Sequence, residues 1–301
     1  MKDRIFNVIA QFIYERSRLS FSGHKKTVLR HCLEDRMKQV AVSDLQDYWD
    51  LVRTSPQEVA ALFDLITTNE TVFFRNKKQF EYLMDKIIPG IEAARGQEVI
   101  RSWGGEKDVP SQYFMKLRLL CAGCSTGEEP YSLAMALLES LRFPKAWDVE
   151  ILAGDLSDRC IAKASGGYYE NDRLKGVPRE YLEKYMERTA DGAVVRDEVK
   201  RLIRFCHLNL GAVIDGGAFP GVAPGFAGFD IIFCRNVMIY FSPESQQKLV
   251  DALSRSLAPG GYFFTGDAEP LHLYSHELET VRDAGCLIYR KSETAKDAKS
   301  V

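Results

Sequence analysis

The residues best suited to chemistry follow a short apolar run at 117–122. The chain then turns through Gly123 and Gly127, and two carboxylates, Glu128 and Glu129, begin a predicted helix. Glycine allows a backbone to pass close to a ligand. Carboxylates at a helix start would repel a diphosphate, which binds the bare amide groups there. The turn therefore favours a cationic ligand with a free amino group, such as S-adenosylmethionine (SAM).

A further acidic residue, Asp155, ends the next predicted strand, ILAGD. Nucleotide sites of α/β proteins place an acid on ribose hydroxyls about 20–30 residues beyond the glycine turn. The alternative role is an N-cap for the helical segment 157–163. A dinucleotide is disfavoured because the turn lacks GxGxxG, and a GxxxxGK phosphate loop is also missing. Together with the glycine turn, Asp155 indicates a nucleoside-containing ligand.

The stretch TTNETVFFR at 67–75 ends in a basic residue. Arg75 shares a predicted helical turn with Thr71, Phe73 and Phe74. The simplest interpretation places both phenylalanines in the core and leaves the arginine on a solvated helix face. The alternative interpretation places Arg75 beside a ligand.

The stretch FDIIFCRNVMIYF at 229–241 is a predicted strand that runs directly into Arg235, Asn236 and Tyr240. Open α/β sheets bind ligands at the carboxyl ends of their strands, which favours a role for these polar residues. The alternative for Tyr240 is a core aromatic ring whose hydroxyl finds a single partner.

No metal site is expected. Cys121 and Cys124 form a CxxC pair, but a second pair is missing and Cys121 falls inside a predicted strand. His272 and His276 have HxxxH spacing without a carboxylate or cysteine that completes a site. Both pairs are therefore read as structural.

The bulk composition sets limits on partners and location. The chain has 301 residues and a net charge of -2, which gives no reason to expect nucleic acid or an anionic membrane surface as a partner. No apolar run approaches the ~20 residues of a transmembrane helix. Seven cysteines, an odd number at irregular spacing, suit a reducing cytoplasm. We therefore expect a cytoplasmic protein without membrane insertion.

The elements that must position these residues fall into two parts. Residues 1–90 show only helical patterns, and residues 91–116 are predicted to be a linker, read as a loop from Arg95 onward. Expected in the helical part are capping boxes at 43–46 and 55–58 and a helix at about 71–94.

From residue 117 to 301, strands and helices alternate, which predicts a parallel, doubly wound sheet. A subdomain at about 168–208 is expected to interrupt it, with 193–195 and 202–207 as a small antiparallel pair. Strands are predicted at 117–122, 149–154, 229–234 and 261–265, and helices at 128–141, 157–165, 178–186 and 243–257.

These motifs resemble the CheR family of chemotaxis protein-glutamate O-methyltransferases. The similar segments are TTNETVFFRN, CAGCSTGEEPYSLAMAL, the strand end at Asp155, CRNVMIYFSPESQQKLV and LAPGGYFF. The resemblance implies an α/β, Rossmann-like SAM-dependent methyltransferase domain with a small inserted β-subdomain, preceded by an all-helical N-terminal domain. It also implies methyl transfer from SAM to glutamate side chains on chemoreceptor cytoplasmic helices, with S-adenosylhomocysteine (SAH) as the product.

The resemblance also assigns roles to residues. Arg75 and Tyr240 would lie nearest the transferred methyl group. The residues expected around the cofactor are Asn69, Thr71, Arg75, Glu129, Asp155, Asn209, Leu210, Arg235 and Asn236. Where the family carries a GHSES-like segment, this chain reads GDAEPL at 266–271.

Two other functions compete with this one. The first is a SAM-dependent methyltransferase that acts on a different protein or on a small molecule, and the second is a non-enzymatic SAM-sensing scaffold. The joint presence of the site residues argues against the scaffold. A basic helix favours a protein acceptor over a small molecule; its residues are Lys25, Lys26, Arg30, Arg36 and Lys38.

Overall fold

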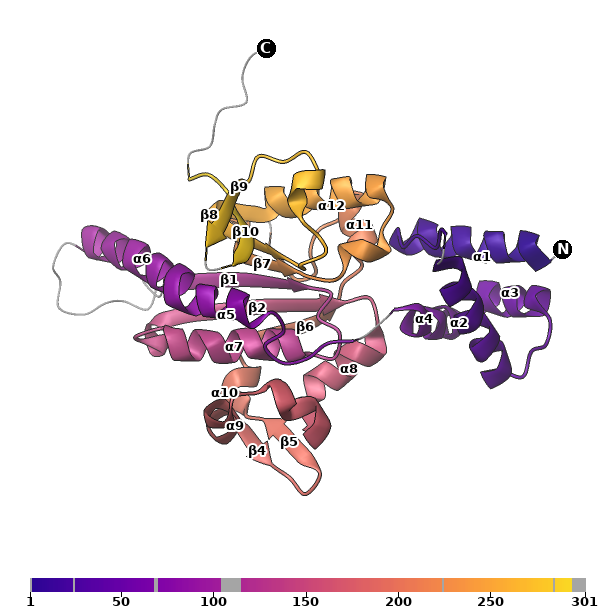
Figure 1. Cartoon of the computed structure of the whole chain (residues 1–301), viewed down its shortest axis with the longest axis horizontal. Coiled ribbons are helices and arrows are strands. Elements are labelled where there is room, and N and C mark those ends of the chain that lie inside the picture. Colours follow the sequence, from indigo (N-terminus) through magenta and orange to yellow (C-terminus); the bar gives the residue numbers. More distant parts are fainter. Residues whose placement is uncertain are drawn as a thin grey trace, which may run out of the picture.

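The computed structural model describes residues 2–23, 25–67, 70–103, 115–223, 225–283 and 285–293. Figure 1 shows a central sheet with helices on both faces, a group of N-terminal helices at one end of the sheet, and a separate small sheet. In the described part of the chain, no helix is long and apolar enough to cross a membrane.

The N-terminal helices are α1 (Lys2–Ser17), α2 (Lys25–Gln39), α3 (Leu45–Thr54) and α4 (Pro56–Ile66). The predicted helix start before α4 is confirmed, because the Ser55 side chain accepts a hydrogen bond from the Glu58 amide and Pro56 opens the helix. The reciprocal half of the capping box does not form, since the Ser55 amide donates to the Leu51 carbonyl. Before α3 the prediction is wrong by one residue: Asp44, not Ser43, caps the helix through the Gln46 amide.

Much of the basic character of α2 is neutralised locally. Arg36 makes a two-pronged ion pair with the buried Glu58 of α4, which also accepts a hydrogen bond from Tyr48 of α3 at 3.0 Å. Arg30 pairs with Asp3 of α1. Part of the predicted basic face of α2 therefore forms ion pairs that link α2 to α1 and α4.

The segment after α4 differs most from the prediction. Residues 71–76 form an irregular turn rather than a helix, with left-handed backbone at Phe74 (φ 53°) and Asn76 (φ 61°). Helix α5 begins at Lys77 and ends at Tyr82, and a π-helical turn at Leu83–Ile87 leads into α6 (Ile88–Trp103). The predicted loop from Arg95 is thus helical as far as Trp103, and residues 104–114 lie outside the described residues.

The large sheet has the strand order β6-β2-β1-β7-β8-β10-β9 among the described residues. The first five strands pair in parallel, which confirms the predicted parallel sheet for β1, β2, β7 and β8 but not the antiparallel pairing predicted for β6, and β10 runs antiparallel to both neighbours. The sequence analysis missed the last two strands and the pairing of β6. The strands are β1 (Met115–Ala122), β2 (Trp147–Asp155), β6 (Ile203–His207), β7 (Phe229–Cys234), β8 (Leu257–Thr265), β9 (Glu279–Asp283) and β10 (Cys286–Arg290).

Both faces of the large sheet are buried, because alternate residues of one strand enter different cores. On β1, Leu120 packs in a core with α1–α4 and α12 (Pro243–Ser256), whereas Leu119 packs in a core with α5, α6 and α7 (Glu128–Ser140). The N-terminal helices therefore share a hydrophobic core with one face of the sheet.

The small sheet has the order β3-β5-β4, with strands Tyr168–Glu170, Gly192–Val195 and Met186–Arg188. The predicted pairing of 193–195 with 202–207 is wrong, since 203–207 is β6 of the large sheet. Other helices of this region are α8 (Asp158–Gly166), α9 (Arg179–Tyr185), α10 (Asp197–Lys200) and α11 (Leu210–Ile214), with a 3-10 turn at Asn171–Gly176.

Candidate active site

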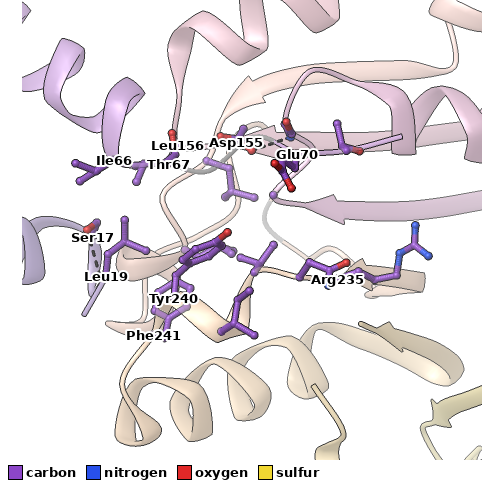
Figure 2. Close-up of a pocket in the computed structure, with 18 of the residues that line it drawn as sticks. Ser17, Leu19, Ile66, Thr67, Glu70, Asp155, Leu156, Arg235, Tyr240 and Phe241 are labelled. Carbon is purple, nitrogen blue, oxygen red and sulfur yellow. Dashed lines mark hydrogen bonds between the residues drawn. The ribbon is translucent and has the colours of Figure 1, made fainter. Parts of the chain in front are cut away.

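A cavity of about 510 Å³ lies at the carboxyl ends of β1, β2 and β7. Figure 2 shows Asp155, Leu156 and Thr67 across the cavity from Tyr240 and Phe241, with Ser17 and Leu19 at its side. Among the predicted site residues, Asn69 lies outside the described residues. The others all line this cavity: Thr71, Arg75, Glu129, Asp155, Asn209, Leu210, Arg235, Asn236 and Tyr240.

The glycine turn has the backbone geometry that the sequence indicates. Gly123 (φ 81°) and Gly127 (φ 98°) are both left-handed, a conformation that costs glycine nothing. The amides of Gly123 and Cys124 both donate to the Gly154 carbonyl, which ties the turn to β2. A Cβ on Gly123 would lie 2.4 Å from the Val237 side chain, so only glycine fits at this wall of the cavity.

Asp155 anchors the same turn from the end of β2. Its carboxylate accepts hydrogen bonds from the amides of Ser125 at 2.8 Å and Ser157 at 2.9 Å. Burial raises the pKa of this carboxyl, while the backbone hydrogen bonds act in the opposite direction. The alternative N-cap role belongs to Ser157, whose hydroxyl accepts from the Cys160 amide. Asp155 is therefore free of a capping role and faces the cavity.

Glu129 and Arg235, which both line the cavity, form a buried ion pair. Arg235 donates Nε to Glu129 Oε2 at 2.6 Å, and it also donates Nη1 to the Arg75 carbonyl at 2.7 Å and to Gln79 Oε1 at 2.9 Å. Its guanidinium lies against the Phe233 ring, 5.1 Å from the ring centroid. Arg235, which directly follows β7, thus joins the start of α7 to the turn that contains Arg75.

The second carboxylate of the turn does not face the cavity. Glu128 points toward the small sheet, where Arg173 pairs with it and the Thr126 hydroxyl donates to it at 2.7 Å. The expectation that both carboxylates would attract a cation is therefore wrong for Glu128. The acidic residues that line the cavity are Glu129, Asp155 and Glu70.

Arg75 and Tyr240 both line the cavity, and both are half-buried. Arg75 donates only to the Glu70 carbonyl, at 3.2 Å, within the described part of the chain. The Tyr240 ring packs against the hydrophobic core, and its hydroxyl makes no hydrogen bond within the described segments. Phe73 is buried as predicted, and its neighbour Phe74 occupies a left-handed turn rather than a helix.

Sequence reasoning missed several residues of this site. Lys25 of α2 and Ser20 of the α1–α2 loop line the cavity. The Ser20 amide donates a hydrogen bond to the Tyr240 carbonyl at 2.9 Å. Glu269, within the divergent GDAEPL segment, is 3% exposed and accepts from the amides of Asn236, Ile239 and Gly266. An acidic residue shortly after a buried strand was the available signal for Glu269.

The residues present fit SAM. The cavity volume lies within the roughly 300–1,000 Å³ of small-molecule sites. The Asp155 carboxylate has about four acceptor positions, and the amides of Ser125 and Ser157 donate to two of them, which leaves acceptors for hydroxyl groups. Glu70 adds a carboxylate to the wall without an ion-pair partner among the described residues, a suitable neighbour for an ammonium or sulfonium group.

A cavity lined by acidic residues at the carboxyl ends of parallel strands suits a cationic nucleoside such as SAM, the methyl donor of methyltransferases. Residues 106–285 match the model of the CheR methyltransferase SAM binding domain, and residues 4–67 match that of the CheR methyltransferase all-alpha domain. The chain therefore belongs to the CheR methyltransferase family. The predicted fold class, activity class and cofactor are confirmed.

The curated relatives agree with the family. The chain is 32% identical over 296 residues to a chemotaxis protein methyltransferase of Vibrio parahaemolyticus, a match that covers 96% of this chain and 98% of the relative. It is also 32% identical over 276 residues to the chemotaxis protein methyltransferase of Escherichia coli, covering 89% and 85%. A probable biofilm formation methyltransferase, WspC of Pseudomonas aeruginosa, is 32% identical over 92% of this chain, which spans 60% of that relative.

Proposed function

We propose that this chain methylates glutamate side chains on the cytoplasmic helices of chemoreceptors, with SAM as the donor, and that it works in the cytoplasm. The main support is similarity to chemotaxis protein methyltransferases over nearly the whole chain, including the helical domain. Two basic side chains, Lys25 and Arg75, also line the cavity, which suits a negatively charged acceptor.

The chemistry asks for positioning rather than acid–base catalysis. When bound, SAM supplies an electrophilic methyl group on a positively charged sulfur. A glutamate carboxylate has a reference pKa of about 4.3, so it enters the site already ionised and needs no general base. The protein gains rate by holding the carboxylate in line and by excluding water.

We propose that Arg75 and Tyr240 hold that carboxylate, because both side chains line the cavity. Arg235 binds the Arg75 carbonyl and so holds the backbone from which the Arg75 side chain extends. The Tyr240 hydroxyl would add one hydrogen bond. A single charge and a single hydroxyl orient the acceptor without neutralising its attacking oxygen.

Substitution of Arg75 separates acceptor orientation from cofactor binding. We expect Arg75→Ala to lower methyl transfer by at least about 10²-fold, because orientation contributes much of the rate, while SAH affinity changes by less than about 3-fold. Isothermal titration with SAH beside initial rates measures both quantities. Arg179→Ala is the matched control, since that side chain is exposed and pairs with Glu183.

The acceptor is tested with labelled SAM and receptor-containing membranes from the same cells. The proposal expects base-labile methyl incorporation into receptors, lost in the Arg75→Ala variant. Incorporation into a different protein or a small molecule would overturn the proposed acceptor and leave the methyltransferase class intact. SAH binding without transfer to any acceptor would favour the scaffold.

A further inference from the structure

The small subdomain contacts the glycine turn and the start of α7, residues 123–128, through two polar side chains. We call residues 123–128 the cofactor turn. The Tyr169 hydroxyl of β3 donates to the Thr126 carbonyl at 2.7 Å. Arg173, in the 3-10 turn after β3, donates Nη2 to the Thr126 hydroxyl at 2.7 Å and Nε to Glu128 Oε1 at 2.9 Å. Thr126 and Glu128 flank Gly127, the left-handed residue from which α7 begins.

This contact is built into a closed space. Tyr169 is 1% exposed and Glu128 is fully buried. A Cβ on Gly127 would lie 2.7 Å from the Tyr169 hydroxyl and 2.8 Å from the Ala164 side chain. A side chain at position 127 would therefore collide with Tyr169 and Ala164, so the close contact between the turn and Tyr169 requires glycine there.

The same part of the small sheet also contacts the segment that carries Arg75. The Phe73 ring packs edge-on against the Tyr169 ring, with centroids 4.9 Å apart. The Gly176 backbone lies beneath the Phe73 carbonyl, where a Cβ would come within 2.5 Å of the oxygen. Residues 169–176 thus touch both the cofactor turn and the stretch two residues before Arg75.

We propose that Tyr169 and Arg173 are positioning residues for the methyl transfer. They hold Thr126 to Glu128 in the shape that receives SAM, and through Phe73 they set the distance between that turn and Arg75. Packing alone does not require a buried carboxylate such as Glu128 to be paired with a partly exposed guanidinium, because apolar residues of similar volume often serve stability as well. The inference depends on the family's cofactor and not on the identity of the acceptor.

The sharpest test compares two tyrosines of the small subdomain. One bonds the turn before α7, and the other bonds α7 itself. Tyr169→Phe removes the hydrogen bond to the cofactor turn. Tyr185→Phe removes one of similar length, 2.6 Å, to Glu139 near the far end of α7. We expect Tyr169→Phe to weaken SAH binding by about 5–10-fold, as loss of one buried hydrogen bond would, and Tyr185→Phe by less than about 2-fold. Urea unfolding of both variants reports stability separately.

Arg173 provides an independent arm. Arg173→Met leaves Glu128 buried without its cation, so that variant is expected to lose stability. The double variant Arg173→Met/Glu128→Gln removes the stranded charge. We expect it to regain most of the unfolding midpoint and still to bind SAH at least about 5-fold more weakly than the wild type, since Thr126 has lost its donor.

Two outcomes would overturn the proposal. One is an SAH affinity of Tyr169→Phe equal to that of Tyr185→Phe. The other is recovery of both stability and SAH affinity in the double variant, which would make the ion pair merely structural. Because the measurements use SAH binding and unfolding, they give an answer even if the acceptor proves to be something other than a chemoreceptor.

Discussion

Replacing Arg235 by methionine would break the contact on which the site most depends. The arginine side chain is 1% exposed and that of its partner Glu129 is 11% exposed. Methionine keeps the apolar volume between Phe80 and Phe233, the two rings that the guanidinium contacts, but offers no donor. The change therefore tests the charge and the hydrogen bonds with little change in packing.

The size of the effect follows from what is left behind. Removing one partner of a buried ion pair costs about 3–5 kcal/mol, because the other charge stays buried and uncompensated. The Arg75 carbonyl and Gln79 also lose their donor. A loss of this size is a large part of the ~5–15 kcal/mol that holds a typical domain together.

A double-mutant cycle in urea unfolding measures this prediction. Arg235→Met is expected to destabilise by about 3–5 kcal/mol. Adding Glu129→Gln removes the stranded charge and is expected to restore about 2 kcal/mol or more, so that the two changes are strongly non-additive. A loss below about 1 kcal/mol, or simple additivity, would refute the reasoning.

Two other substitutions probe Asp155, which lines the cavity, and Glu269, which binds the backbone of lining residues. Because burial raises the pKa of Asp155, its carboxylate should take up a proton at a higher pH than an exposed aspartate does, and SAH binding by the wild type should weaken as the pH falls. Asp155→Asn should bind weakly without that pH slope; calorimetry at several pH values decides, and an equal slope in both proteins would contradict the assignment. Glu269→Ala should cost about 1–3 kcal/mol in urea unfolding, because three backbone amides lose their acceptor. Unchanged stability would show that water replaces the carboxylate.

The strands and helices around the cavity were predictable because their patterns are local. Apolar runs, capping residues and glycine turns placed β1, β2, β7, α7 and α12 within a few residues of their observed bounds. The carboxyl ends of parallel strands lie at one edge of a sheet, so Glu129, Asp155 and Arg235 could be expected to meet there. That part of the site follows from topology alone.

The parts that the sequence did not reveal depend on contacts between distant residues. Residues 71–76 have helix-forming neighbours, but Ser132 of α7 accepts the Phe74 amide hydrogen bond and Arg235 binds the Arg75 carbonyl, which hold the segment in a turn. Strand β6 follows a polar turn like a hairpin partner, yet it pairs with β2. Local patterns carry no information on such partners.

The carboxylates at the start of α7 show why residue type alone misassigns charge. Glu128 and Glu129 are adjacent in sequence, but successive residues of a helix point about 100° apart, so they enter different environments. Arg173 binds Glu128 on the side of the small subdomain, whereas Arg235 binds Glu129 at the cavity. Among the described residues that line the cavity, the carboxylates without an ion-pair partner are therefore Asp155 and Glu70 rather than the two at the start of the helix.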